Sequence, residues 1–320
     1  MIKIDKNAKK YVAHEVILIE PTNFASNKET AKDNTYMHPN EVPENIHEIV
    51  LAEHRDLQKK ITDLGGKLKL AHQVIKEAYD SIFACDWFLT LRDSAFPDGL
   101  LVLFPLRWHS RQLERNPELI ADLSKRYKTV LDLTHWEKKG KSLESIGVVS
   151  LDYHNRILYM NESERAHAEV LHDFVEQLNK LKKDEKEYTS CILKAWDPVD
   201  NDVVFHTSMY LNFTDSTVFY GPDFITDVPM RKVLMDRFIE SGYDIIELSV
   251  AECRDFCSNV TEFAGKDDRL CLAIAARAAR GYTPENLAKL KEKYLLAIND
   301  NDNILKFGGG STRCMSNLLF

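Results

Sequence analysis

Apolar residues recur at helical spacing in five segments of the chain, and most of these segments carry a signal for a helix end. Glycines such as Gly65 and Gly242 follow two of them, because glycine adopts the left-handed conformation that closes a helix. Asn116 and Thr283 each precede a proline, as a capping residue does. Asn161 and the acid three residues later are spaced like a capping box. The pattern predicts helices over 48–64, 117–127, 162–182, 229–241 and from 284 to about 298.

Short runs rich in β-branched and aromatic residues lie between these helices and predict strands. The predicted strands are 16–19, 67–71, 100–104, 130–133, 148–151, 157–160, 203–205, 217–220, 245–248 and 270–275. No stretch between them is rich enough in proline, glycine or serine to be a linker, so residues 1–320 are expected to form a single α/β domain. Two or three strands with one helix, five times over, indicate a closed array of modules. An ordinary α/β fold with a mixed sheet is the alternative.

The composition narrows the class of protein. The chain has 320 residues, of which 44% are hydrophobic and 29% charged, as in a globular protein. Lys and Arg number 42 against 50 Asp and Glu, and the net charge of -8 opposes binding to a phosphate backbone, so no nucleic-acid partner is expected. The longest apolar run, 100–106, is far shorter than the roughly 20 residues that span a bilayer. With a Lys-rich N-terminus that lacks a signal-peptide core, the chain is predicted to be cytoplasmic, without a membrane partner.

The six cysteines show no CxxC spacing, which argues against a zinc ribbon, a thioredoxin motif or a disulfide framework. Free thiols are therefore expected. Because no histidine or cysteine cluster has the spacing of metal ligands, neither a metal nor a cofactor is predicted.

The segment before Cys314 is the most unusual part of the chain. Three consecutive glycines, Gly308 to Gly310, are costly in conformational entropy, which predicts a close backbone approach or unusual dihedral angles. The loop backbone and Arg313 provide surroundings that favour a thiolate at Cys314, the reactive form of cysteine. The alternative is a flexible tail that ends in a buried cysteine.

Thiol chemistry needs a proton carrier and acids, and four residues qualify. His206 follows the apolar run 203–205, at a place where a side chain reaches the mouth of a sheet. Glu144 stands in a small-residue turn before another predicted strand. Asp80 and Asp86 flank large apolar residues, where a carboxylate is expensive to bury without a cation or donors. The alternative for His206 is a structural residue, and the alternative for Glu144 is a surface position.

The order of these segments resembles the arginine deiminase superfamily of guanidine-modifying enzymes, over nearly the whole chain. The likeness is greatest to its citrulline-hydrolase-like and dimethylarginine-hydrolase-like branches. Each similar segment is short, and the last, the loop of the cysteine nucleophile, is the most specific. The segments are 20–24 with 27–31 and Asn34, 80–86, 110–115, 143–147, 205–207, 259–263 and 308–315.

The resemblance implies a fold and a reaction. The fold would be a five-bladed α/β propeller of ββαβ-type modules with pseudo-fivefold symmetry. Cys314 would attack the central carbon of a guanidino or ureido group, and His206 would protonate the leaving amine and activate water. Asp86 and Glu144 would hold the N–H donors of the substrate.

Two further residues are implied with a role left open. Arg111 would either orient a substrate carboxylate or neutralise Glu114. Asp80 would either contact the substrate or support its neighbours.

The departures from the family pattern bear on the substrate. Ser208 stands where arginine deiminases and amidinotransferases carry an acid, two residues after the histidine, and Ser145 stands where the turn of Glu144 has glycine. Asp86 replaces the asparagine of many citrulline hydrolases. These features predict an amidinohydrolase of arginine metabolism that binds the guanidino group of a small substrate through an acid on one side only. Citrulline is the second candidate substrate. An amidinotransferase and a non-catalytic binding protein are the alternatives, and a homo-oligomer is left open.

Overall fold

The structure of the protein is a computed structural model that describes residues 3–40 and 42–320. It has a mixed α/β fold in which five three-stranded sheets share one pattern: the middle strand pairs antiparallel with one neighbour and parallel with the other. The sheets are β17 (Ser316–Leu319), β1 (Glu15–Glu20) and β2 (Lys67–His72); β3 (Phe88–Leu91), β4 (Leu100–Leu103) and β5 (Thr129–Asp132); β6 (Val149–Asp152), β7 (Ile157–Asn161) and β8 (Thr189–Leu193); β11 (Leu211–Phe213), β12 (Thr217–Tyr220) and β13 (Asp244–Glu247); β14 (Thr261–Ala264), β15 (Leu270–Ala275) and β16 (Leu295–Asn299). A two-stranded ribbon joins β9 (Trp196–Asp197) to β10 (Asp202–Val203).

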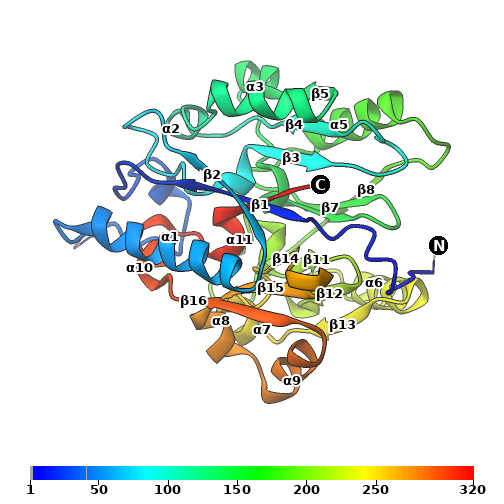
Figure 1. Cartoon of the computed structure of the whole chain (residues 1–320). Coiled ribbons are helices and arrows are strands. Elements are labelled where there is room, and N and C mark those ends of the chain that lie inside the picture. The colour runs from blue at the N-terminus through cyan, green and yellow to red at the C-terminus, as the bar shows by residue number, and fades with distance from the viewer. Residues whose placement is uncertain (1–2, 41) are drawn as a thin grey trace.

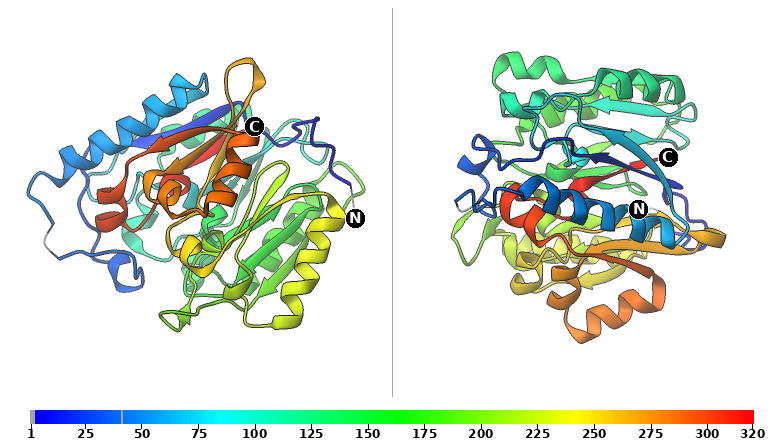
Figure 2. Two further views of the ribbon diagram at one scale, coloured as in Figure 1. Left: turned by 90° about the horizontal axis from the view of Figure 1, so that it is seen from below. Right: turned by 60° about the vertical axis from the view of Figure 1, so that its left-hand side comes forward.

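Each parallel pair is connected through helix, because parallel strands require a crossover rather than a tight turn. The crossover helices lie toward the outside of the molecule and the sheets toward its centre (Figures 1 and 2). They are α1 (Ile46–Asp63), α3 (Pro117–Arg126), α5 (Ala168–Leu181), α6 (Val228–Ser241) and the pair α8 (Ala276–Gly281) and α9 (Pro284–Lys293). The predicted recurrence of strands with one helix, five times, is thus present.

Shorter helical turns lie between and within the modules, and several of them carry the candidate site. The α-helical turns are α2 (His109–Gln112), α4 (Ser145–Val148), α7 (Val250–Arg254), α10 (Asp302–Gly308) and α11 (Thr312–Met315). The 3-10 turns are η1 (Thr30–Lys32), η2 (Ala84–Asp86), η3 (Thr134–Lys139), η4 (Thr207–Met209), η5 (Pro222–Phe224) and η6 (Lys266–Asp268).

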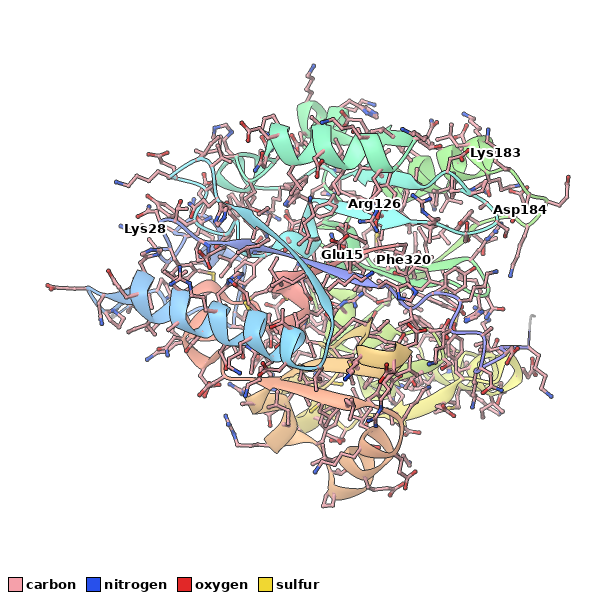
Figure 3. All side chains as sticks on the ribbon, in the orientation of Figure 1. Glu15, Lys28, Arg126, Lys183, Asp184 and Phe320 are labelled. Carbon is pink, nitrogen blue, oxygen red and sulfur yellow. The ribbon has the colours of Figure 1, made fainter. Side chains whose placement is uncertain are left out.

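The two ends of the chain meet in one sheet. The last strand, β17, pairs antiparallel with β1, so the segment that follows Cys314 is held by the N-terminal module. Arg126 at the end of α3 forms an ion pair with Glu15 at the start of β1, and both lie near Phe320 (Figure 3). The Tyr127 hydroxyl donates to the carbonyl of Phe320 over 3.0 Å. The C-terminal segment is therefore fixed on both sides.

Strands β3, β4 and β12 are buried at every residue, which explains why their sequences do not alternate between polar and apolar positions. No helix in the described parts of the chain is long and apolar enough to cross a membrane.

Most of the predicted helices are confirmed at their starts and their stops. Asn116 accepts hydrogen bonds from the backbone N–H groups of Glu118 and Leu119 at the start of α3. Gly242 ends α6 with φ = 84°, in the left-handed region. These local signals were reliable because they depend on neighbouring residues only.

Three boundary predictions are wrong. The helix expected over 162–182 begins at Ala168, because Asn161 is the last residue of β7 and its side chain bonds to the backbone of Ala195 and Val204 rather than capping a helix. The helix expected to reach about 298 ends at Lys293, and the apolar residues after it form β16 beside β15. The strand expected over 203–205 stops at residue 203.

Candidate active site

The glycine run before Cys314 makes the close contacts that its sequence predicts. Gly309 ends α10 with φ = 75°, and a Cβ at this position would lie 2.2 Å from the side chain of Asn34. A Cβ on Gly308 or Gly310 would lie 2.8 or 2.5 Å from the ring of Phe83. The loop therefore packs too tightly for any side chain, and the alternative of a flexible tail is excluded.

Cys314 is buried in α11, where its sulfur is surrounded by hydrogen-bond partners. The side-chain amide of Asn259 donates to Sγ over 3.4 Å, and its oxygen accepts from the backbone N–H of Arg313 over 2.9 Å. A hydrogen bond with Cys85 is the largest influence on the thiol and, against the opposing effect of burial, lowers the pKa of Cys314 to about 6. At neutral pH the residue is therefore a thiolate, the form that acts as a nucleophile.

This pKa gives a first prediction. Below pH 6 the Cys314 thiol is mostly protonated and unreactive, and above pH 6 it is mostly ionised. The rate of its alkylation by iodoacetamide should therefore increase with pH along a titration curve with a midpoint near pH 6. Burial raises the pKa of the other five cysteines, which should react slowly over this range. Mass spectrometry of the Cys314 peptide measures the rate. A midpoint near the free-cysteine value of about 8.5 would contradict the assignment.

Glu144 is held at the site by a strained turn. Its neighbour Ser145 has φ = 43°, in the left-handed region where the family has glycine, and the Ser145 hydroxyl donates to the carbonyl of Phe88 over 3.0 Å. A Cβ on Gly147 would lie 2.5 Å from Oδ1 of Asp86, so this glycine lets the two acids approach. The hydrogen bond of Ser145 offsets a backbone strain of about 1–2 kcal/mol that its left-handed conformation costs.

The Glu144 carboxylate is fully buried and ionised. Burial alone would raise its pKa, but Arg165, His206 and Arg111 together hold the pKa of Glu144 well below its usual range. The backbone N–H of Arg107 also donates to Oε1 over 3.2 Å. Glu144 is thus a fixed negative charge within the site.

His206 lies beside Glu144, at the start of η4 rather than at the end of a strand. Its Nε2 is 3.6 Å from Oε2 of Glu144 and is buried without a hydrogen-bond partner. Asn161 positions the segment, since its side chain donates to the carbonyl of Val204 and its backbone N–H donates to the Thr207 hydroxyl. The imidazole is therefore held with one nitrogen available for proton transfer.

Asp86 and Asp80 come together around Arg111. The Arg111 guanidinium donates to Oδ2 of Asp86 over 3.0 Å, lies 3.9 Å from Oδ2 of Asp80, and binds Glu114 through two nitrogens. Burial raises the pKa of Asp80, against the lowering influence of Arg111. Burial likewise raises the pKa of Glu114, against the lowering influence of Arg111, which binds both of its oxygens.

The sequence alone did not reveal Arg165, which is buried at the site on the connection between β7 and α5. It donates to Oδ1 of Asp33 over 2.5 Å and to Oε2 of Glu144 over 3.4 Å. Asp33 and Asn34 belong to the N-terminal loop that follows β1, and Asn34 donates to the carbonyl of Gly309. Arg165 therefore links this loop to Glu144, and its position inside a polar connection gave no signal in the sequence.

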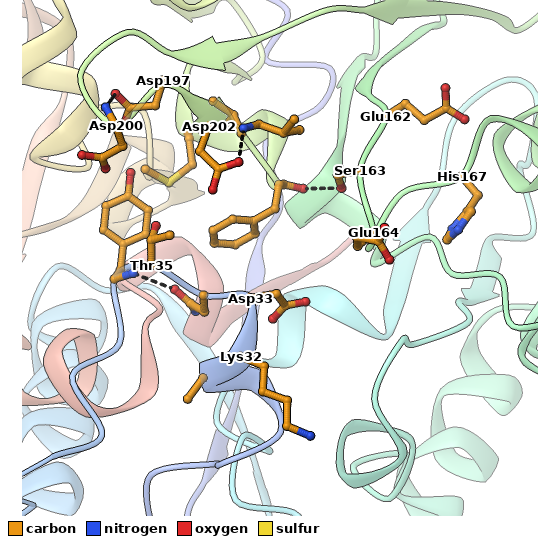
Figure 4. A pocket seen from close by; sticks show the side chains of 17 residues that line it. Lys32, Asp33, Thr35, Glu162, Ser163, Glu164, His167, Asp197, Asp200 and Asp202 are labelled. Carbon is orange, nitrogen blue, oxygen red and sulfur yellow. Dashed lines mark hydrogen bonds between the residues drawn. The ribbon is translucent and has the colours of Figure 1, made fainter.

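The loop closes the site. The cavity between Cys314, His206, Asp86 and the loop has a volume of about 20 Å³, which is room for about one water. A much larger pocket of about 740 Å³ lies on the other side of residues 31–36 (Figure 4). Its lining is rich in acids, namely Asp33, Glu162, Glu164, Asp197, Asp200 and Asp202.

Asp86, Glu144 and His206 offer ligand atoms within 4.8 Å of one another, the only such group in the described residues. No metal was predicted, because no histidine or cysteine cluster in the sequence has the spacing of metal ligands. Two of the three face the guanidinium of Arg111 at 3.0 and 3.8 Å, so the geometry also suits an organic cation with N–H donors.

Comparisons with known proteins bear on both fold and family. The sequence model of a family described as N,N dimethylarginine dimethylhydrolase, eukaryotic, matches residues 20–320. No curated protein matches this chain.

Solved structures share the fold at low identity. The substrate-bound N-terminal domain of an arginine dihydrolase, from the ornithine-ammonia cycle in cyanobacteria, superposes with a TM-score of 0.69 at 16% identity, over 95% of this chain and 97% of that one. An apo structure of an arginine dihydrolase of this cycle gives 0.68 at 16% identity, over 95% of this chain and 40% of that one. A dimethylarginine dimethylaminohydrolase in an adduct with S-methyl-L-thiocitrulline gives 0.64 at 17% identity, over 96% and 100%.

Proposed function

Because the chain belongs to the eukaryotic N,N-dimethylarginine dimethylhydrolase family, we propose that it hydrolyses a carbon-nitrogen bond of a guanidino substrate through a covalent intermediate on Cys314. The substrate class that fits best is an arginine derivative with a substituted terminal nitrogen. The observation that carries the proposal is the meeting of a thiolate, an unpartnered imidazole nitrogen and two buried acids around one small cavity.

The reaction follows from these positions. The Cys314 thiolate attacks the central carbon of the guanidinium, and His206 gives a proton to the amine that leaves. A water then takes the place of the amine, His206 removes its proton, and attack on the thiouronium carbon releases the ureido product and the thiolate. Asp86 and Glu144 hold the N–H donors of the substrate in both steps, as charge-assisted pairing of a planar cation with carboxylates requires.

The charges of the site support a cation as substrate. Four buried acids, Asp80, Asp86, Glu114 and Glu144, surround the buried guanidinium groups of Arg111 and Arg165. The acids outnumber these two cations, and the Cys314 thiolate adds a further negative charge. A guanidinium brings a positive charge that offsets this excess, and a neutral urea does not.

Two N–H groups of Arg111 already donate hydrogen bonds to the carboxyl group of Glu114. This pairing supports its role as the partner of Glu114 rather than as the group that binds a substrate carboxylate. Asp80 accepts from Asn27 and Thr30 of the N-terminal loop, which supports a positioning role.

Substrate entry requires the N-terminal loop to move. A volume of about 20 Å³ does not admit a guanidino group, so residues 30–34 must swing away from Gly309 and Arg165 before binding. The acidic pocket on the outer face of the loop would attract a cationic substrate toward this entrance.

A second prediction concerns the charge that Asp86 recognises. Asp86→Asn should lower kcat/KM for guanidino substrates roughly fivefold to 150-fold, which corresponds to about 1–3 kcal/mol, while the small activity expected on citrulline should fall less. Asparagine has a neutral amide that suits a urea better than a guanidinium. Steady-state assays with Nω,Nω-dimethylarginine and citrulline give the ratio, and Asp122→Asn, on the surface of α3, is the matched control. An unchanged ratio would show that Asp86 does not recognise substrate charge.

The finer expectations about architecture also belong to this proposal. Five sheets with one strand order, closed by the pairing of β17 with β1, support a five-bladed propeller formed by one domain. The location of the chain in the cytoplasm stays a prediction.

A further inference from the structure

A second thiol, Cys85, lies against the proposed nucleophile. Cys85 is in η2, which packs against α11, the turn that carries Cys314, and the Cys85 thiol has the largest influence on the pKa of Cys314. Its Sγ also donates to Oδ1 of Asp86 over 3.0 Å. Both cysteines are buried, with exposed fractions of 1% and 7%. Cys85 therefore lies between the nucleophile and an acid of the site without lining the cavity itself.

Hydrogen bonds tie the two turns that carry the cysteines to each other. The side-chain amide of Asn317, just after α11, donates to the carbonyl groups of Ala84, in η2, and of Phe88, two residues after η2, over 3.2 and 2.6 Å. On its other side α11 is fixed by Asn259, which accepts from the N–H of Arg313. Because the two turns are tied to each other, the two cysteines that they carry are held near each other.

We propose that Cys85 is the resolving thiol of Cys314, so that oxidation of the nucleophile by a peroxide ends in a Cys85–Cys314 disulfide that a thiol reductant can reverse. The proposal rests on the proposed function only in taking Cys314 as the reactive thiolate. The pair is a modification site in its own right, and its formation needs no guanidino substrate.

The two steps balance with hydrogen peroxide as oxidant. The Cys314 thiolate attacks one oxygen, the O–O bond breaks, and the released hydroxide takes up a proton to leave as water, which gives a sulfenic acid on Cys314 and reduces the peroxide. The Cys85 sulfur then attacks the Cys314 sulfur. Asp86 first accepts the proton of the Cys85 thiol. As the S–S bond forms, the S–O bond breaks, and the hydroxyl group takes this proton and leaves as water.

The surroundings set the order of these steps. Burial and the neighbouring Cys314 and Asp86 raise the pKa of Cys85 well above its usual value, so Cys85 stays a thiol while Cys314 is ionised and is oxidised first. The closed cavity of about 20 Å³ is close to the size of a water or a peroxide and excludes a guanidino substrate. Oxidation can therefore proceed while the N-terminal loop is closed.

The test maps the bond directly. The full-length protein is treated with hydrogen peroxide, free thiols are blocked with N-ethylmaleimide, and the digest is examined by mass spectrometry. We expect a peptide pair joined through Cys85 and Cys314, together with loss of activity that dithiothreitol restores. In Cys85→Ser the same treatment should drive Cys314 on to sulfinic acid, so that the fraction of activity restored falls about tenfold relative to the wild type.

Cys191→Ser is the matched control, since Cys191 is the more exposed thiol and lies on β8, outside the site. It should form the disulfide and recover like the wild type. Sulfinic acid on Cys314 without the joined peptides in the wild type, or equal recovery in Cys85→Ser, would overturn the proposal. The mapped disulfide does not depend on turnover, so failure of the proposed hydrolysis would appear separately, as an absence of amine release from the reduced protein.

Discussion

Cys314→Ser should lose essentially all turnover of guanidino substrates, by a factor of about 10⁴ or more, because a serine hydroxyl is a far weaker nucleophile than a thiolate at neutral pH. The structure makes the loss specific, since the hydrogen bond with Cys85 lowers the pKa of this cysteine alone among the six. The measurement is a steady-state assay of amine release, combined with intact mass after incubation with S-methyl-L-thiocitrulline. The wild type should gain one adduct and the variant none.

The fold of the variant must be preserved for this result to count. Serine is close to cysteine in size, and Asn259 still has a side-chain acceptor to bind, so the thermal unfolding temperature should change little. Cys253→Ser, at a buried thiol outside the site, is the matched control and should keep its activity. Turnover in Cys314→Ser within tenfold of the wild type would exclude the covalent mechanism.

His206→Ala is expected to have the second largest effect. Removing a general acid and base costs about 10²- to 10⁴-fold in rate, and here one imidazole serves both proton transfers. The acids remain, since the Glu144 carboxylate keeps Arg165 and the backbone N–H of Arg107 as partners. Substrate binding should therefore weaken far less than kcat, which calorimetry and steady-state kinetics measure separately.

Another histidine provides the control for that experiment. His135→Ala removes a half-exposed imidazole on η3 and should leave kcat unchanged. If His206→Ala loses binding and kcat in equal proportion, the histidine holds the substrate rather than transferring protons.

The parts of the fold that local sequence determines could be predicted. Asn116 and Gly242 mark helix ends through contacts with their own neighbours, and the structure confirms both. Asn161 failed as a cap because its backbone pairs in β7 and its side chain binds segments more than 30 residues away. Strands β14 and β17 were missed because each has only four residues, and β17 also depends on a partner at the other end of the chain. Strand β16 was missed because its apolar residues were assigned to the preceding helix.

The same limit applies to the site. The order of short motifs pointed to Cys314, His206, Glu144 and Asp86, and the structure brings these four to one cavity or its wall. Arg165 gave no signal, because its role depends on tertiary contact with Asp33 and Glu144.

The central claim, hydrolysis of a guanidino carbon-nitrogen bond, is tested most directly by product analysis of the reduced wild-type protein with Nω,Nω-dimethylarginine. Water as the final acceptor predicts dimethylamine and citrulline in equal amounts, whether or not another amine is added. The claim would be contradicted if neither dimethylamine from this compound nor ammonia from arginine were released. Transfer of the amidino group to the added amine would also contradict it.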